Sequence, residues 1–164
     1  MNFYTHCPSP LGQLTLLAHD QGLLGVYFEQ HQHFRGLQDA KLNPDAPHLA
    51  MAVYQLHEYF AGQRKVFDLQ LDLSRGSAFQ QKVWLALATI PFATTCSYGE
   101  LAQRIAAPKA VRALGAANGR NPFSIILPCH RVIASTGALT GYAGGLQRKQ
   151  MLLEFERNQE NRHD

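Results

Sequence analysis

The sequence predicts an α+β protein in two parts, with strands and one helix in the first part and mostly helices in the second. Alternating apolar residues and turn residues fill residues 1–75, whereas helix-capping patterns recur in residues 76–164. The polar stretch Ser74-Arg75-Gly76 separates them. A chain of 164 residues can form one domain or two small ones. We therefore predict an N-terminal α/β domain over 1–75 and a second domain over 76–164.

The N-terminal part begins with a predicted hairpin over residues 9–28, in which two alternating apolar runs flank the turn residues 19–22. Helical apolar spacing follows from Pro47 to Ala61, with Gly62 as the stop signal. From Val66 to Leu73, apolar and polar residues alternate. This alternation predicts a strand with one exposed face.

The C-terminal part carries two capping boxes, Ser77-x-x-Gln80 and Ser97-x-x-Glu100, each predicting a helix start. A third helix is expected from about Pro108 to Asn118, ending at Gly119. The two short helices on either side of the break before Pro108 form a helix-turn-helix pattern. A last helix is expected from Leu146 to about Arg157.

Charge is distributed unevenly between the two parts. Residues 1–75 carry five Lys or Arg and seven Asp or Glu, whereas residues 76–164 carry ten and five. The second part is the candidate surface for a polyanion, and a merely solvated basic face is the alternative. No apolar run approaches the ~20 residues of a membrane span, and no signal peptide is recognisable. The odd, widely spaced cysteines Cys7, Cys96 and Cys129 favour free thiols in a reducing, cytoplasmic setting.

The predicted helix from Pro108 to Asn118 has few large side chains. Val111 and Leu114 can face the core, and Lys109 and Arg112 are the only long side chains on the remaining surface. The other surface positions are small: Ala110, Ala113, Gly115 and Ala116. Such a helix lets its backbone approach a large surface closely, with Arg112 projecting from its middle. An Ala-rich helix packed tightly on its neighbours is the alternative.

The run from Ile125 to Ile133 predicts a buried strand, yet its middle is Pro128-Cys129-His130-Arg131. Cys129 is the candidate nucleophile, because a neighbouring base raises the thiolate fraction. Glu156 shares a helix face with Leu152 and is the candidate third member, whereas Glu154 points elsewhere. In a strand, Cys129 and His130 point to opposite faces, so either the chain turns or a water relays the proton. An inert core cysteine and a Cys/His hydrolase or acyl transferase remain open.

Residues 77–157 resemble the catalytic domain of the O6-alkylguanine-DNA alkyltransferases, also called methylated-DNA–protein-cysteine methyltransferases. Three stretches carry the resemblance: Pro128-Cys129-His130-Arg131-Val132, the Ala-Val-Arg-Ala-Leu-Gly-Ala-Ala-Asn-Gly-Arg-Asn-Pro run over 110–122, and Gly141-Tyr-Ala-Gly-Gly-Leu-Gln-Arg-Lys to residue 149. Residues 1–75 resemble the family's variable N-terminal domain more loosely. The resemblance implies a ribonuclease-H-like N-terminal domain, a winged helix-turn-helix C-terminal domain and a stand-alone member of the family.

The resemblance also implies roles for individual residues. Cys129 would accept the alkyl group irreversibly in a single turnover, with His130 taking the thiol proton through a water and Glu156 orienting His130. Tyr98 would donate toward the departing guanine, and Asn121 would brace the backbone. The substrate pocket would include Asn121, Pro128, Arg131, Val132, Tyr142, Ala143 and Gly144. Arg112 would fill the space left by the flipped nucleotide, and the duplex would lie on Lys109, Ala110, Ala113, Gly115 and Ala116.

The implied partner is double-stranded DNA, contacted in the minor groove with little sequence specificity by a monomer. O4-alkylthymine is a further candidate substrate. No metal is expected, because Cys7 has no matching ligand cluster, and no cofactor is expected. The rival functions are a Cys/His hydrolase or acyl transferase, which would turn over repeatedly, and a helix-turn-helix regulator, which would not need Cys129.

Overall fold

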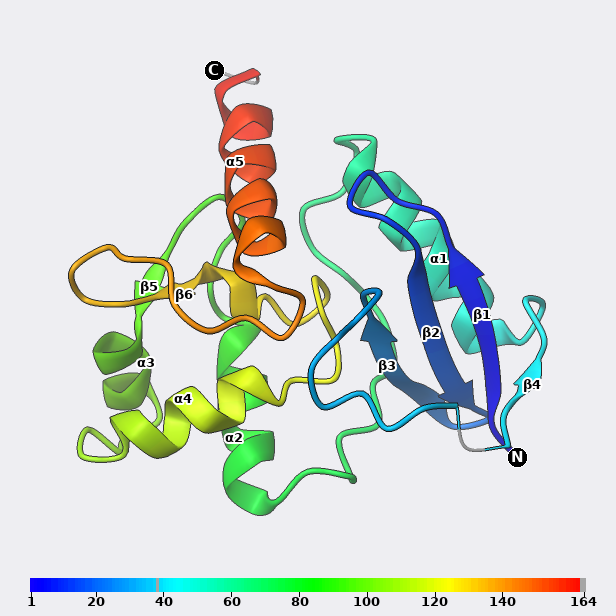
Figure 1. Ribbon diagram of the computed structural model, residues 1–164, viewed down its shortest axis with the longest axis horizontal. Helices are drawn as coiled ribbons and strands as arrows, with labels where there is room; N and C mark the ends of the chain where they lie inside the picture. Colours follow the sequence, from blue (N-terminus) through cyan, green and yellow to red (C-terminus); the bar gives the residue numbers. More distant parts are fainter. Residues whose placement is uncertain (38, 163–164) are drawn as a thin grey trace.

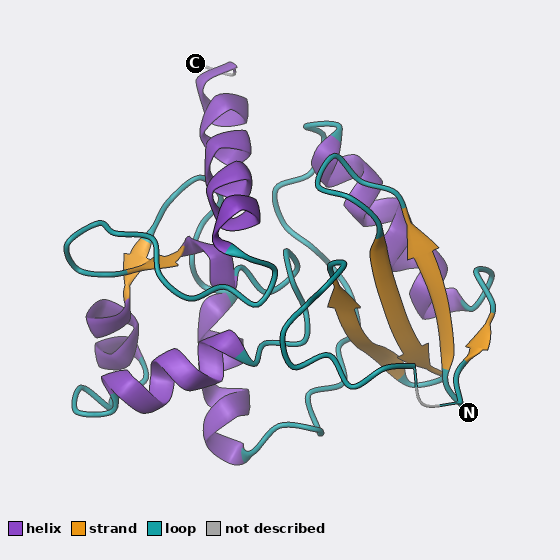
Figure 2. Cartoon of the chain, in the orientation of Figure 1, coloured by secondary structure: helices purple, strands orange, loops and turns teal. Residues whose placement is uncertain are grey.

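A computed structural model describes residues 1–37 and 39–162 of the chain. It confirms the α+β class: a sheet with one helix forms one side of the molecule, and four helices with a small second sheet form the other (Figure 1, Figure 2). The elements of the N-terminal segment, residues 1–75, are β1 (Phe3–Cys7), β2 (Leu14–His19), β3 (Gly22–Tyr27), β4 (Lys41–Leu42) and α1 (Pro47–Phe60). Those of the C-terminal segment are α2 (Ala78–Leu87), β5 (Cys96–Ser97), α3 (Tyr98–Arg104), α4 (Val111–Gly119), β6 (Val132–Ile133) and α5 (Leu146–Arg162).

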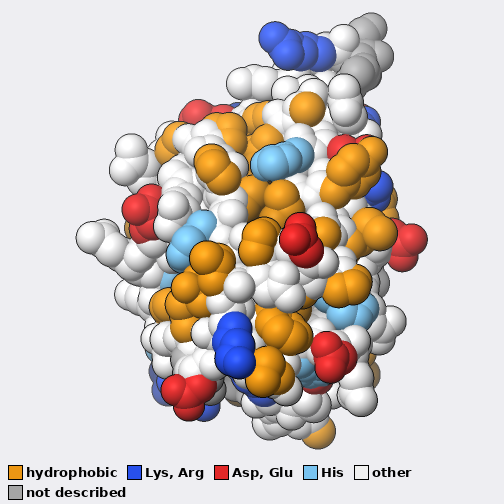
Figure 3. Space-filling model, turned by 90° about the vertical axis from the view of Figure 1, so that its right-hand side faces the viewer, with side chains coloured by type: hydrophobic (Ala, Val, Ile, Leu, Met, Phe, Trp, Pro, Cys, Tyr) orange, Lys and Arg blue, Asp and Glu red, His pale blue; other side chains and the backbone are white. Residues whose placement is uncertain are grey.

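The N-terminal sheet has the order β3-β2-β1-β4. The predicted hairpin is present as β2 and β3, which are antiparallel, and β1 pairs antiparallel with β2 from Phe3↔Ala18 to Cys7↔Leu14. Helix α1 packs across one face of this sheet and begins, as predicted, at Pro47. Acidic, histidine and apolar side chains are interspersed on the outer side of this segment, with few Lys or Arg among them (Figure 3).

The prediction of a strand from Val66 to Leu73 is wrong. Among the described residues, this segment pairs with the sheet only through an isolated bridge between Leu71 and Leu23, with hydrogen bonds from Leu23 N to Gln70 O and from Asp72 N to Leu23 O. The alternating pattern is therefore produced by an extended loop. Its apolar side chains from Phe67 to Leu73 pack on the core cluster, whereas Val66 is exposed. The strand β1 escaped prediction because its residues alternate too weakly in polarity.

Both predicted capping boxes are present. Ser77 accepts from Gln80 N at the start of α2, and Ser97 accepts from Glu100 N at the start of α3, with the reciprocal side-chain bonds also formed. Helix α4 begins at Val111 rather than Pro108, because Ala106 adopts a left-handed φ of 58° and the following residues form a turn. Val111, expected to face the core, is 40% exposed.

The two segments share one hydrophobic cluster, which includes β-strand residues such as Leu16 and helix residues such as Leu114. They are also joined by backbone hydrogen bonds at the edge of β3. Val26 N donates to Pro122 O over 2.8 Å, and Ser124 N donates to Val26 O over 3.2 Å. The chain leading to Cys129 is therefore attached directly to the N-terminal sheet. Within the described residues, no helix is long and apolar enough to cross a membrane.

Candidate active site

The segment from Asn121 to Ile133 turns repeatedly instead of forming the predicted strand, of which only β6 (Val132–Ile133) exists. Ile125 has a φ of 73°, a left-handed conformation that is rare for a β-branched residue. Leu127 N donates to Phe123 O, and Cys129–Arg131 form a single 3₁₀ turn that starts after Pro128. The apolar run is typical of a strand, but here a compact series of turns, rather than a sheet, buries its side chains.

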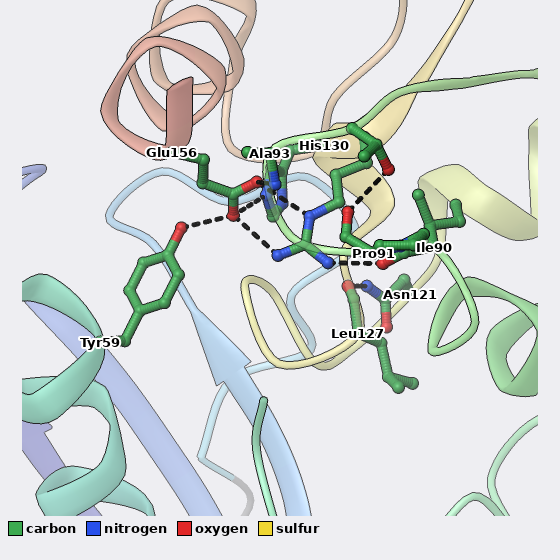
Figure 4. Close-up of polar contacts among 10 residues, drawn as sticks. Tyr59, Ile90, Pro91, Ala93, Asn121, Leu127, His130 and Glu156 are labelled. Atoms are coloured by element: carbon green, nitrogen blue, oxygen red, sulfur yellow. Dashed lines mark hydrogen bonds and ion pairs between the residues drawn. The ribbon is translucent and has the colours of Figure 1, made fainter. Parts of the chain in front are cut away.

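Glu156, on α5, is the centre of a buried polar network (Figure 4). Its Oε2 accepts from His130 Nε2 over 2.8 Å, from Arg131 Nη2 over 2.9 Å and from Tyr59 Oη over 2.7 Å. Its Oε1 accepts from Arg131 Nε over 2.9 Å and from Ala93 N over 3.2 Å. The Glu156 side chain is 0% exposed, so all of these contacts lie away from solvent.

The ionisation of the network follows from these contacts. Burial alone would raise the pKa of Glu156, but His130 and Arg131 outweigh it and hold that pKa well below its ordinary value. Burial lowers the pKa of His130 against the pull of Glu156, so the imidazole is neutral near neutral pH. Because a carboxylate can only accept, Nε2 of His130 carries the proton. Nδ1 is then the basic nitrogen, and it is buried without a hydrogen-bond partner among the described residues.

Cys129 is 4% exposed and its sulfur lies beside Asn121, whose Nδ2 donates to Sγ over 3.1 Å. Asn121 also donates to Leu127 O over 2.8 Å and accepts from Phe123 N over 2.9 Å, so one side chain fixes both the turn and the sulfur. Burial raises the pKa of the Cys129 thiol to about 11, although the bond from Asn121 and the charge of Lys149 oppose the rise. The resting thiol is therefore protonated, and a base is needed to make it a nucleophile.

Two residues of this region escaped the sequence analysis. Lys149 is fully buried, and its Nζ donates to Val132 O over 2.6 Å and to Thr140 O over 2.7 Å. Burial lowers the pKa of Lys149 to about 8. Tyr59 reaches Glu156 from α1. The burial of Lys149 could have been predicted from sequence, since Lys149 lies one helical turn before Leu152 and Leu153 and shares their face. No local sequence pattern marks Tyr59, because its partner is 97 residues away.

The predicted pocket residues lie in two groups. Tyr142, Ala143 and Gly144 are buried in the loop between β6 and α5, where Ala143 O accepts from Gln32 N over 3.0 Å. A Cβ atom on Gly144 would lie 2.5 Å from the Phe28 ring, so the loop approaches the N-terminal segment closely. The second group comprises Arg131, Pro128 and Val132. The Arg131 guanidinium donates to Glu156 and to Ile90 O. Pro128 caps the 3₁₀ turn, and Val132 offers its carbonyl to Lys149.

Tyr98 lies at the start of α3, between this loop and α4. Its hydroxyl donates to Thr140 O over 3.3 Å, and a Cβ atom on Gly115 would be 3.9 Å from its ring. Leu114 and Ala117 of α4 face the core, which leaves Arg112, Ala113 and Ala116 on the exposed side, with Lys109 exposed just before the helix. Gly115 and Ala110 are half-buried. The small residues and the two basic side chains therefore share one accessible surface.

A helix-turn-helix beside a buried thiol and a hydrogen-bonded imidazole–carboxylate pair is the arrangement expected of a DNA-binding protein that transfers a group to cysteine. Comparison with known sequences agrees. Residues 2–73 match the family model of the 6-O-methylguanine DNA methyltransferase ribonuclease-like domain, and residues 78–158 match that of the 6-O-methylguanine DNA methyltransferase DNA-binding domain. The chain belongs to the 6-O-methylguanine DNA methyltransferase family.

Individual relatives resemble the chain over nearly its whole length. A methylated-DNA–protein-cysteine methyltransferase of Mycolicibacterium paratuberculosis is 51% identical over 154 residues, covering 94% of this chain and 92% of the relative. The constitutive enzyme of that name in Bacillus subtilis is 43% identical over 160 residues, covering 96% of each chain. A crystal structure of Mycobacterium tuberculosis OGT in complex with DNA superposes with a TM-score of 0.89 at 48% identity, covering 96% of this chain and 94% of that one.

Proposed function

We propose that this protein repairs alkylated DNA directly, by moving a methyl or larger alkyl group from O6 of guanine to Sγ of Cys129. The carbon–oxygen bond breaks as the carbon–sulfur bond forms, and the bonding electron pair leaves with the guanine. The thioether product has no free thiol, so each molecule reacts once. O4-alkylthymine carries the same kind of alkyl–oxygen bond, with thymine as the leaving group, and is a further candidate substrate. In this proposal residues 76–164 carry the chemistry, and residues 1–75 support them.

The observation that carries the proposal is the unpartnered Nδ1 of His130. It is the basic nitrogen of a neutral imidazole whose other nitrogen is held by an ionised carboxylate. No hydrogen bond joins His130 to Cys129 among the described residues, and a buried polar atom without a protein partner is a typical water site. A water between Nδ1 and Sγ would pass the thiol proton to His130, and Glu156 would stabilise the imidazolium that results.

The departing guanine acquires negative charge, and the Tyr98 hydroxyl, which lies between α4 and the loop before α5, would donate to it. Tyr142, Ala143 and Gly144 would cover the base. The target oxygen is inaccessible inside a duplex, so the nucleotide must leave the stack, at a cost of a few kcal/mol. Arg112, exposed on α4, would occupy the vacated space.

The small residues on the exposed side of α4 favour close docking in the minor groove, where few base edges can be distinguished. We therefore propose a monomer that binds duplex DNA with little sequence preference and with an affinity that falls as salt rises. The three cysteines are free thiols, which supports a reducing compartment such as the cytoplasm.

The test is a reaction with duplex DNA containing one O6-methylguanine, followed by mass spectrometry of the digested protein. The peptide containing Cys129 should gain the mass of one methylene group in a stoichiometric reaction, and Cys129→Ser should gain none while still binding the duplex. Cys7→Ser, which changes a buried thiol elsewhere, should react like the wild type. Repeated turnover on esters or amides, with no adduct on Cys129, would favour a Cys/His hydrolase instead.

A further inference from the structure

We infer that the N-terminal segment contributes a positioning residue to the active site: the Tyr59 hydroxyl orients Glu156 and, through their shared oxygen, limits how strongly His130 binds a proton. The inference rests on the proposed function, in which Glu156 supports His130. If the inference holds, residues 1–75 affect the proton transfer itself and do not only support the fold.

The contact is specific and fully buried. Tyr59 lies on α1 and donates from Oη to Glu156 Oε2 over 2.7 Å, and both side chains are 0% exposed. Figure 4 shows Tyr59 approaching the Glu156 carboxylate from the side opposite His130. Its ring is held by four aromatic neighbours, Phe60, Phe67, Phe92 and Phe155, with ring centroids 5.0, 5.6, 6.1 and 5.3 Å away. This packing holds the ring so that its hydroxyl lies within hydrogen-bond distance of Glu156.

Tyr59 and His130 compete for the same oxygen. Oε2 accepts from both of them and from Arg131, whereas Oε1 accepts from Arg131 and Ala93 N. A donor on a carboxylate oxygen draws electron density from it, which makes that oxygen a weaker acceptor for the other donors. Tyr59 remains a donor throughout the working range, because burial and then the charge of Glu156 raise its pKa well above the ordinary value.

The direction of the effect on His130 follows. His130 must be neutral to take the thiol proton. Its protonation is opposed first by burial, then favoured by Glu156 and opposed by Arg131 and Lys149. The other titratable groups around the network are Cys129 and Tyr142. Removing the Tyr59 hydroxyl leaves Oε2 more available to His130. The imidazole should then protonate at a higher pH, and the acidic limb of the pH–rate profile should move upward with it.

The experiment compares Tyr59→Phe with Tyr54→Phe, a control on the same helix whose side chain is 62% exposed. Two quantities are measured on each full-length protein: the midpoint of His130 protonation from imidazole nitrogen NMR shifts, and the acidic limb of single-turnover transfer from an O6-methylguanine duplex. Tyr59→Phe should raise both by up to about one pH unit. Tyr54→Phe should leave both unchanged.

A ring-fluorinated tyrosine at position 59 gives a test of opposite sign, because a more acidic phenol donates more strongly and should lower the His130 midpoint. Unchanged NMR midpoints in both variants, in proteins that fold normally, would overturn the role of Tyr59 and leave the proposed function intact. NMR midpoints that move while the transfer profile does not would instead remove His130 from the proposed reaction.

Discussion

Asn121 donates a hydrogen bond from Nδ2 to the sulfur of Cys129, 3.1 Å away, and the same amide holds Leu127 O and Phe123 N. The residue that shapes the turn thus also positions the nucleophile. Asn121→Ala should lower the free energy of unfolding by about 1–3 kcal/mol, because buried backbone groups lose their partners. It should also slow alkyl transfer when measured at a temperature where the variant remains folded. The exposed Asn158→Ala is the control, and equal transfer rates would contradict a role in positioning the sulfur.

Glu156→Gln should slow transfer and destabilise the fold, because the new amide group turns an NH₂ toward donors that need an acceptor. Leaving Arg131 without its carboxylate should cost about 3–5 kcal/mol, the range for breaking a buried ion pair. Glu154→Gln is the matched control: Glu154 is exposed and contacts only Gln150 in the described side chains. Denaturation curves and single-turnover rates distinguish the two, and similar behaviour of both variants would exclude Glu156 from the relay.

Stability should depend on pH through Cys129. Its pKa in the folded protein is raised to about 11 by burial, against about 8.5 for an unfolded cysteine. The unfolded chain therefore loses its proton first as pH rises. The contribution is fully present below about pH 8.5 and declines by about 1.4 kcal/mol per pH unit until about pH 11. Urea titrations should show a steeper decline between about pH 8.5 and pH 11 in the wild type than in Cys129→Ser. Parallel curves would mean that the thiol is not shielded.

Arg112→Ala should slow transfer from duplex DNA more than transfer from the free base O6-methylguanine, since only the duplex requires a nucleotide to be flipped. It should also reduce the slope of log affinity against log salt by about 1. Arg157→Ala, exposed on α5 and away from α4, serves as the control. Equal slowing on both substrates would show that Arg112 acts at the pocket or on the fold.

Gly144→Ala should weaken the attachment of the loop before α5, because the added Cβ would lie 2.5 Å from the Phe28 ring. We expect a loss of about 1–3 kcal/mol in unfolding free energy and slower transfer. Gly119→Ala on α4 adds a Cβ that has no heavy atom of the described residues within 4 Å. Thermal unfolding of that variant should therefore occur at or above the wild-type temperature. A wild-type melting curve for Gly144→Ala would show that the loop can shift at no cost.

The features that could be predicted from sequence are those with local causes. The Ser77 and Ser97 capping boxes each satisfy helix N–H groups within four residues, so the pattern and the structure coincide. The placement of Glu156 on the same face as Leu152 depends only on helical periodicity, and both side chains are fully buried.

Features set by distant contacts could not be predicted. The Ile125–Ile133 run has the composition of a strand, but the pairing of Val26 with Phe123 and the amide of Asn121 bend it into turns. Tyr59 fits the apolar spacing of α1, and no residue near it in sequence indicates that its hydroxyl binds Glu156. Lys149 likewise depends on carbonyls of Val132 and Thr140 that only the folded chain presents.

A cysteine that can react only once must remain intact until its substrate arrives. Peroxide and other small oxidants attack thiolates that are exposed to solvent, beginning with sulfenic acid. Cys129 is 4% exposed, and its raised pKa keeps the sulfur protonated near neutral pH. The burial that keeps the Cys129 thiol protonated therefore also shields the resting protein from oxidative inactivation.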